Sequence, residues 1–118
     1  MNNYKELKVW QKSVELAIRV YEVTKGFPHE EMYGLISQMR RSAISVPSNI
    51  AEGAGRDTDK DFSKFLGISY GSTCELETQL IIAHKVNFVD HKTLEHFQND
   101  INVIQKMNWA LKQTLKLE

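Results

Sequence analysis

Apolar residues recur at spacings of three and four along most of the chain, and the alternation typical of a half-buried strand is absent. This spacing places apolar side chains on one face of a helix, because an α-helix turns once in about 3.6 residues. Four such stretches follow one another with short connections, which make consecutive helices antiparallel neighbours. The pattern therefore predicts an all-α, antiparallel up-and-down four-helix bundle, with residues 1–118 forming one domain.

The first two helices have clear expected ends. The first covers about residues 7–25 and stops at Gly26, with a proline two positions later. The second covers about residues 30–52 and is ended by Gly53 and Gly55. Pro47 lies inside this second stretch and removes one backbone donor, so we expect a kink near Ala43 or Ile44. The alternative is two shorter helices, broken at the proline.

The third and fourth helices begin at recognisable caps. Thr58 has capping-box spacing to Asp61 and opens the third helix, which ends near Asn87. Asp90 is suited to cap the fourth, which has a seam of the coiled-coil type. We expect the following seven side chains in the core: Trp10, Met39, Phe65, Leu76, Phe97, Ile104 and Leu111.

The first helix carries two apolar stripes, whereas an amphipathic helix normally has one. We expect the first stripe to face the core: Leu7, Trp10, Val14, Ala17, Ile18 and Tyr21. The second lies more than about 100° around the helix: Val9, Leu16, Val20 and Val23. We interpret the second stripe as a contact surface for another subunit. The alternative is a wide core face with scattered exposed valines.

The third helix has a stripe of small residues nearly opposite Leu76, formed by Gly67, Gly71, Cys74 and Thr78. A glycine inside a helix costs about 1 kcal/mol relative to alanine, so a close contact should offset two of them. Gly67 and Gly71 are therefore predicted to be helix-packing residues. Their partner is another helix of the same chain or of a neighbouring subunit.

The second helix has a polar stripe beside its apolar one: Gln38, Ser42, Ser45, Asn49 and Glu52. Serine and asparagine compete for backbone hydrogen bonds and do not favour helix, unlike the Lys and Glu of most solvated faces. The stripe therefore indicates a hydrogen-bonded helix contact or a ligand surface. The alternative is an ordinary polar face.

The sequence has no pattern of catalytic or metal-binding residues. No two histidines have the spacing of a zinc-binding helix, and no Glu-x-x-His motif of a di-iron bundle occurs. Cys74, in mid-helix without a histidine close in sequence, is interpreted as an inert thiol. We therefore predict no enzymatic activity, no catalytic or cofactor-binding residues and no metal site.

Charge argues against strong nucleic-acid binding. The chain has 15 Lys and Arg against 15 Asp and Glu, and residues 1–25 are its only net basic segment. The expected nucleic-acid contacts are in that segment: Lys5, Lys8, Lys12 and Arg19. Three arginines, Arg40, Arg41 and Arg56, can contact phosphates, but we favour internal pairing with nearby glutamates. We predict weak, salt-sensitive RNA or DNA binding at most.

The single cysteine excludes an intramolecular disulfide and fits a reducing compartment. The N-terminus lacks the apolar core of a signal peptide, and no apolar run approaches the roughly 20 residues of a membrane span. We therefore expect a cytoplasmic protein without a membrane partner.

Several motifs along the chain resemble those of a known protein family. They are Tyr4-x-x-Leu7-x-Val9-Trp10-Gln11, Tyr33-Gly34-Leu35, Gln38-x-Arg40-Arg41-Ser42-Ala43, Ser45, Asn49-Ile50-Ala51-Glu52-Gly53, Phe65-Leu66, Gly71-Ser72 and Glu75-Leu76. The chain resembles the bacterial four-helix bundle proteins encoded in intervening sequences of large-subunit ribosomal RNA genes, which are often labelled as a ribosomal protein.

The resemblance implies an antiparallel four-helix bundle that forms a ring-like pentamer, and it transfers no catalytic residue. A related protein, the accessory protein of diversity-generating retroelements, is strongly basic and binds a reverse transcriptase and nucleic acid, whereas this chain is neutral. The following residues, which lie in the central motif or directly after it, are candidate interaction residues: Gln38, Arg40, Arg41, Ser45, Asn49, Glu52, Gly53 and Arg56.

We therefore expect a non-enzymatic, oligomeric helical scaffold that docks a protein partner. The alternative is a nucleic-acid-binding accessory factor of weak, salt-sensitive affinity.

Overall fold

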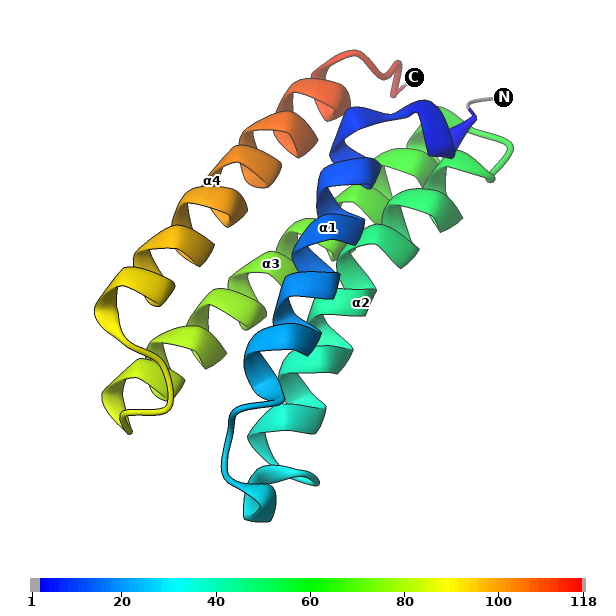
Figure 1. Ribbon diagram of the computed structural model, residues 1–118. Coiled ribbons are helices and arrows are strands. Elements are labelled where there is room, and N and C mark those ends of the chain that lie inside the picture. The colour runs from blue at the N-terminus through cyan, green and yellow to red at the C-terminus, as the bar shows by residue number, and fades with distance from the viewer. Residues whose placement is uncertain (1–2, 118) are drawn as a thin grey trace.

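The computed structural model describes residues 3–117, which form four α-helices and no strand. The helices are α1 (Lys8–Thr24), α2 (Leu35–Ala54), α3 (Asp59–Lys85) and α4 (His91–Gln113). Two short 3₁₀ helices, η1 (Tyr4–Glu6) and η2 (His29–Glu31), precede α1 and α2 (Figure 1). The predicted all-α class is confirmed.

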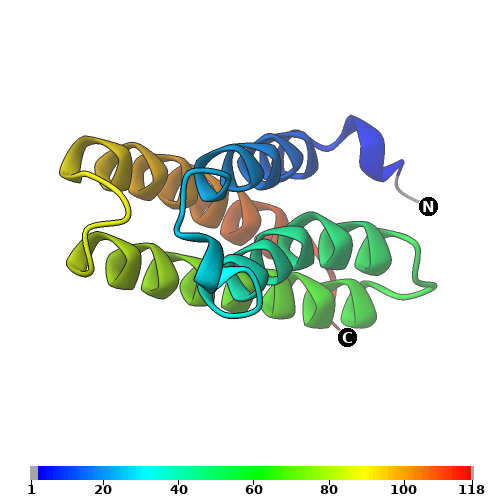
Figure 2. The same ribbon diagram turned by 60° about the horizontal axis from the view of Figure 1, so that its bottom comes forward.

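The helices run up and down in chain order, and each packs against the two helices beside it in the order α1, α2, α3, α4 and back to α1. Helices α1 and α4 form one layer and α2 and α3 the other (Figure 2). The α2–α3 connection lies at the end of the bundle where the described chain starts and finishes (Figure 1). The α1–α2 and α3–α4 connections lie at the opposite end, where the rings of Phe27 and Phe88 pack 5.4 Å apart.

The two predicted caps are confirmed. The hydroxyl of Thr58 accepts from the Asp61 backbone N–H at 3.1 Å, and the carboxylate of Asp90 accepts from the Thr93 N–H at 2.8 Å. Hydrogen bonding with the side chain and then the backbone of Thr93 lowers the pKa of Asp90. The left-handed backbone of Asn87, with φ of 67°, leads the chain out of α3 and toward α4.

The predicted core is confirmed at four of its seven positions, because Met39, Leu76, Phe97 and Ile104 are buried. The other three, Trp10, Phe65 and Leu111, are partly buried. Asn108, the polar residue in the seam of α4, is buried as well and donates to the Leu66 carbonyl oxygen at 3.0 Å. A buried amide is tolerated here because a hydrogen bond replaces its lost hydration.

The expected core face of α1 is only partly confirmed, because Ala17 is buried and Leu7 and Trp10 pack against the core, but the stripe does not continue there. Leu16 and Val20 of the second stripe are fully buried, whereas Ile18 and Tyr21 of the first stripe are 54% and 37% exposed. The buried face also contains Ser13 and Thr24, whose hydroxyls donate to carbonyl oxygens of their own helix at 2.6 and 2.7 Å. These local hydrogen bonds satisfy both hydroxyls, so a stripe interrupted by polar residues can face the core.

Helix α2 begins later and ends later than expected. It starts at Leu35, whose backbone N–H donates to Glu31 Oε1 at 3.2 Å, because residues 29–31 form η2 instead. It continues through Pro47 as a single helix, so the alternative of two shorter helices is wrong. It also continues through Gly53 and ends with Gly55 as its C-cap, so Gly55 is confirmed as a helix stop and Gly53 is not.

Gly53 lies where α2 packs so closely against α3 that a larger side chain would overlap its neighbours. A Cβ atom on Gly53 would lie 2.7 Å from Phe65 Cβ and 3.2 Å from the Phe62 carbonyl oxygen. By contrast, a Cβ on Gly67 would meet only the Lys112 ammonium at 3.6 Å, and one on Gly71 would meet nothing within 4 Å. Within the chain the close helix packing therefore belongs to Gly53, and packing of Gly71 against a second subunit stays a prediction.

Replacing Gly53 with alanine should destabilise the fold by about 1–3 kcal/mol, because the new methyl group overlaps a Cβ and a backbone carbonyl that cannot move independently. Gly71→Ala is the matched control within α3. It adds the same methyl group into open space and should be neutral or stabilising by up to about 1 kcal/mol. Urea unfolding followed by circular dichroism measures both, and equal stability of the two variants would contradict the close approach at Gly53.

Candidate functional site

The polar stripe of α2 faces α3 and forms a hydrogen-bonded helix contact. The hydroxyls of Ser45 and Ser72 lie 2.8 Å apart, and Ser69 donates to the Val46 carbonyl oxygen at 2.8 Å. The Asn49 amide donates to both the carbonyl oxygen and the hydroxyl of Ser45, at 2.8 and 2.9 Å. Small side chains thus let the two helices approach closely. Ser45 and Ser69 bond across the contact, whereas Asn49 bonds within α2.

The three arginines of the motif region have different environments. Arg40 donates to Thr24 Oγ1 at 2.9 Å and to the Tyr21 carbonyl oxygen at 3.3 Å, and its guanidinium lies 4.5 Å from the Tyr21 ring centre. Arg56 pairs with Glu52 at 3.3 Å. Arg41 is exposed and forms no ion pair within residues 3–117. The expected pairing with a nearby glutamate is therefore found only for Arg56. Arg40 bonds instead to a hydroxyl and a carbonyl oxygen of α1, and Arg41 has no ion pair within residues 3–117.

Arg41 lines a polar groove of about 310 Å³ between α2 and α3. The groove has six lining residues: Gln38, Arg41, Ser42, Ser45, Glu75 and Gln79. The motif residues Gln38, Arg41 and Ser45 are therefore brought together at one groove, whereas Asn49, Glu52, Gly53 and Arg56 lie outside it. The sequence did not single out Glu75 and Gln79 as site residues, although both lie on α3 one helical turn apart.

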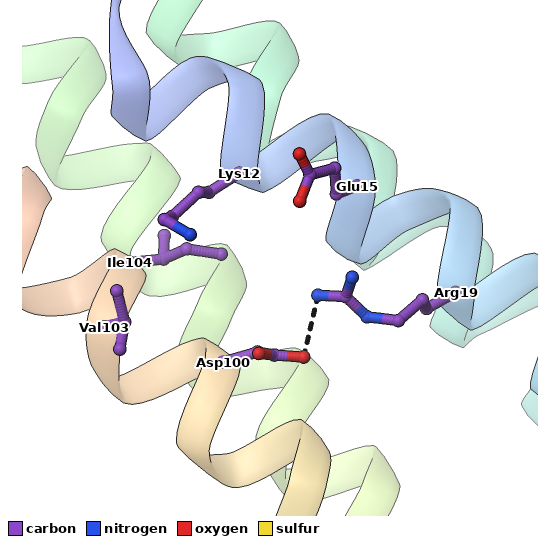
Figure 3. A pocket seen from close by; sticks show the side chains of 6 residues that line it. All are labelled: Lys12, Glu15, Arg19, Asp100, Val103 and Ile104. Carbon is purple, nitrogen blue, oxygen red and sulfur yellow. Dashed lines mark ion pairs between the residues drawn. The ribbon is translucent and has the colours of Figure 1, made fainter.

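The expected nucleic-acid contacts do not form an uninterrupted basic surface. Arg19 forms an ion pair with Asp100 of α4, with 2.7 Å between Nη2 and Oδ2 (Figure 3). Lys12 and Glu15 line the same small pocket, so two carboxylates lie among its basic groups. Lys5 and Lys8 are exposed.

An apolar groove of about 510 Å³ lies between α1 and α2. It has eight lining residues: Val14, Ala17, Ile18, Tyr21, Glu22, Lys25, Ile44 and Pro47. Half of these belong to the α1 stripe that the sequence assigned to the core. Helix α1 is therefore apolar on two faces. Ile18 and Tyr21 of the first stripe are exposed, whereas Leu16 and Val20 of the second stripe lie in the core.

A second exposed apolar surface lies on the α3–α4 side, centred on Trp109, which is 63% exposed. Trp109 and Tyr70 line a shallow groove together with Asn102, Gln105 and Lys106. The sequence analysis did not single out Trp109. Trp109 directly follows Asn108, which belongs to the core-facing seam of α4, so the sequence could have shown that the indole lies outside that seam.

Within the described part of the chain, no group of three or more His, Cys, Asp or Glu is arranged to hold a metal ion. His84 and His91 approach each other, with 5.8 Å between their ring centres. Cys74 is exposed, and the Gln105 amide lies 3.8 Å from its sulfur. None of the described helices is long and apolar enough to cross a membrane.

The fold and its surfaces define an all-α four-helix bundle with grooves between neighbouring helices. The chain belongs to the 23S rRNA-intervening sequence protein family, whose model matches residues 5–110. This finding agrees with the resemblance noted in the sequence.

One solved structure, from Bacteroides thetaiotaomicron, is described as a protein with unknown function from the S23 ribosomal protein family. It is 24% identical, the match covers 88% of this chain and 97% of that chain, and the TM-score is 0.79. At this identity the likeness shows the fold alone. No curated protein matches the chain.

Arg40 and Arg41 are neighbours in sequence, but replacing them with alanine should change the stability of the fold by different amounts. Arg40→Ala should cost about 1–3 kcal/mol, because it leaves Thr24 and the end of α1 without hydrogen bonds from a charged group. Arg41→Ala should change stability by less than about 0.5 kcal/mol, since the side chain is exposed and unpaired. Thermal unfolding compares the two, and equal effects would contradict the different environments described above.

Proposed function

We propose that this protein is a non-enzymatic, oligomeric helical scaffold that docks a protein partner. The observation that carries the proposal is the pair of exposed apolar surfaces on opposite sides of the bundle. One is the α1–α2 groove with Ile18 and Ile44, and the other is the α3–α4 surface with Tyr70 and Trp109. Exposed apolar side chains that gather at a groove mark a candidate contact site.

The two surfaces differ in size, and this favours head-to-tail association between unlike surfaces. The α1–α2 surface is a groove of about 510 Å³, whereas the α3–α4 surface is a smaller groove of about 220 Å³ with the exposed indole of Trp109 in its lining. Contacts between unlike surfaces close into a ring when the rotation between copies allows it. The family resemblance suggests five copies for the ring.

A ring leaves the α2–α3 side of each copy outside the head-to-tail contacts. Any partner that binds this side meets the same surface once per subunit. Repetition then raises the overall affinity of a multivalent partner well above that of one contact. This is how a scaffold with weak individual sites holds a protein partner in our proposal.

Ile44→Glu and Trp109→Ala should each disrupt the assembly, the first by placing a charge in the groove and the second by removing the exposed indole. Each variant alone should be monomeric by light scattering, while the parent forms an oligomer. An equimolar mixture should form a dimer with one copy of each variant, because each variant retains the surface that the other lacks.

Val103→Glu is the control, since Val103 is exposed on the α1–α4 side and lies in neither surface. It should leave the oligomer intact. A parent protein that is monomeric at high micromolar concentration contradicts the proposal. A mixture that does not form dimers shows instead that the contact joins like surfaces.

The second candidate function is a nucleic-acid-binding accessory factor, which the exposed Lys5 and Lys8 favour. We rank it second, because Arg19 is paired and carboxylates interrupt the basic groups. Binding that depends on a few exposed lysines falls steeply with salt. RNA binding by this protein should therefore be weak at low salt and lost at about 200 mM salt.

A pull-down from the native cytoplasm, with and without nuclease, separates the two candidates. A specific, nuclease-resistant protein partner supports the scaffold. Tight RNA binding that survives about 200 mM salt and is lost in Lys5→Glu/Lys8→Glu would reverse the ranking.

A further inference from the structure

The polar groove between α2 and α3 contains two side chains of opposite charge that lack charged partners. Arg41 projects from α2 and Glu75 from α3, and both line the same groove. Neither forms an ion pair with any group in residues 3–117, and they do not pair with each other. The groove therefore offers one positive and one negative group to a ligand.

Neutral hydrogen-bonding groups lie between these charges. The amides of Gln38 and Gln79 line the groove from the two helices. Gln79 Oε1 is buried and accepts no hydrogen bond from the described residues. A buried acceptor without a donor is unfavourable, so a donor on a ligand would be stabilising at this position.

The polar groove continues into an apolar one. Gln38 also lines a groove of about 420 Å³ at the end of the bundle, where Leu35, Ile82, Val86 and Phe88 form the apolar part. Gly34 and Glu31 complete its lining, and the Glu31 carboxylate accepts from the Leu35 N–H. Ile82 and Val86 are each 48% exposed, so this apolar surface is open to a ligand. One continuous surface thus has two charges at one end and aliphatic and aromatic groups at the other.

We infer that this surface binds a small zwitterion with an apolar side chain, of which a free leucine-like or phenylalanine-like amino acid is the simplest form. Its carboxylate pairs with the Arg41 guanidinium, and its ammonium pairs with Glu75 and donates to Gln79 Oε1. Its side chain passes Gln38 and lies against Leu35 and Ile82.

Other ligand classes fit less well. A simple anion such as phosphate or a fatty acid satisfies Arg41 but is repelled by the Glu75 carboxylate in the same groove. A simple amine satisfies Glu75 and leaves Arg41 unpaired. A ligand with both charges on one short skeleton satisfies both, and the two adjoining grooves are large enough for such a molecule.

The inference goes beyond the scaffold function and does not depend on it. The groove lies on the α2–α3 side, which is outside both surfaces proposed for assembly. A monomeric variant such as Trp109→Ala should therefore retain ligand binding. Failure of the scaffold proposal and failure of the ligand site are distinguishable in this variant.

The test is a titration of the full chain with L-leucine and L-phenylalanine, followed by backbone amide NMR. We expect saturable shifts that centre on Gln38, Arg41 and Gln79, with a Kd on the order of 1 mM for such a small ligand. Glycine, N-acetyl-L-leucine and L-leucinamide each lack one of the three recognised groups. Each should bind at least about tenfold more weakly.

Arg41→Gln and Glu75→Gln should each weaken leucine binding at least about tenfold, because each removes one charge from the groove. The matched control is Arg56→Gln, which removes an exposed arginine that lies just beyond α2 and pairs with Glu52, and it should bind leucine as the parent does.

Three results would overturn the inference. The first is the absence of saturable shifts with either amino acid up to about 10 mM. The second is binding of N-acetyl-L-leucine as tightly as leucine, which would mean that Glu75 does not recognise an ammonium. The third is leucine binding that is unchanged in Arg41→Gln.

Discussion

The contact between α2 and α3 is the constraint on which the rest of the structure depends. It is built from the smallest side chains of the chain, with Gly53 against Phe62 and Phe65, and serines where the two helices cross further along. Close approach brings polar groups together, and the hydroxyl of Ser45 is satisfied by Ser72 and Asn49. The polar groove adjoins this contact, because Ser45 takes part in both, and Arg41 and Glu75 line the groove from α2 and α3.

Much of this fold was predictable because local signals and helical periodicity agree. Thr58 and Asp90 mark helix starts by their own chemistry, since each side chain accepts from a backbone N–H three residues later. The seam of α4 was equally readable, including Asn108, because its core-facing residues recur at alternating spacings of three and four. The motifs in the sequence indicated the same fold through a family resemblance, and the family model matches residues 5–110.

The sequence failed where two answers satisfied the same period. Helix α1 is apolar on two faces, and periodicity does not say which one meets the core. The buried face contains Ser13 and Thr24, whose hydroxyls bond to their own helix, a detail that composition does not reveal. Only part of the lining of the polar groove could be predicted, because its residues come from two helices. Gln38, Arg41 and Ser45 are close in sequence, whereas Glu75 and Gln79 arrive from another helix.

The dominance of the α2–α3 contact has a consequence for the order of folding. These two helices are consecutive and joined by a short connection, so their contact closes a small loop at low entropic cost. We therefore expect a folding transition state in which the α2–α3 hairpin is formed and α1 and α4 are not yet docked, because this state has the lower entropic cost. Substitutions at Ser45 or Ser72 should then slow folding, whereas substitutions at Arg19 or Asp100 should mainly speed unfolding.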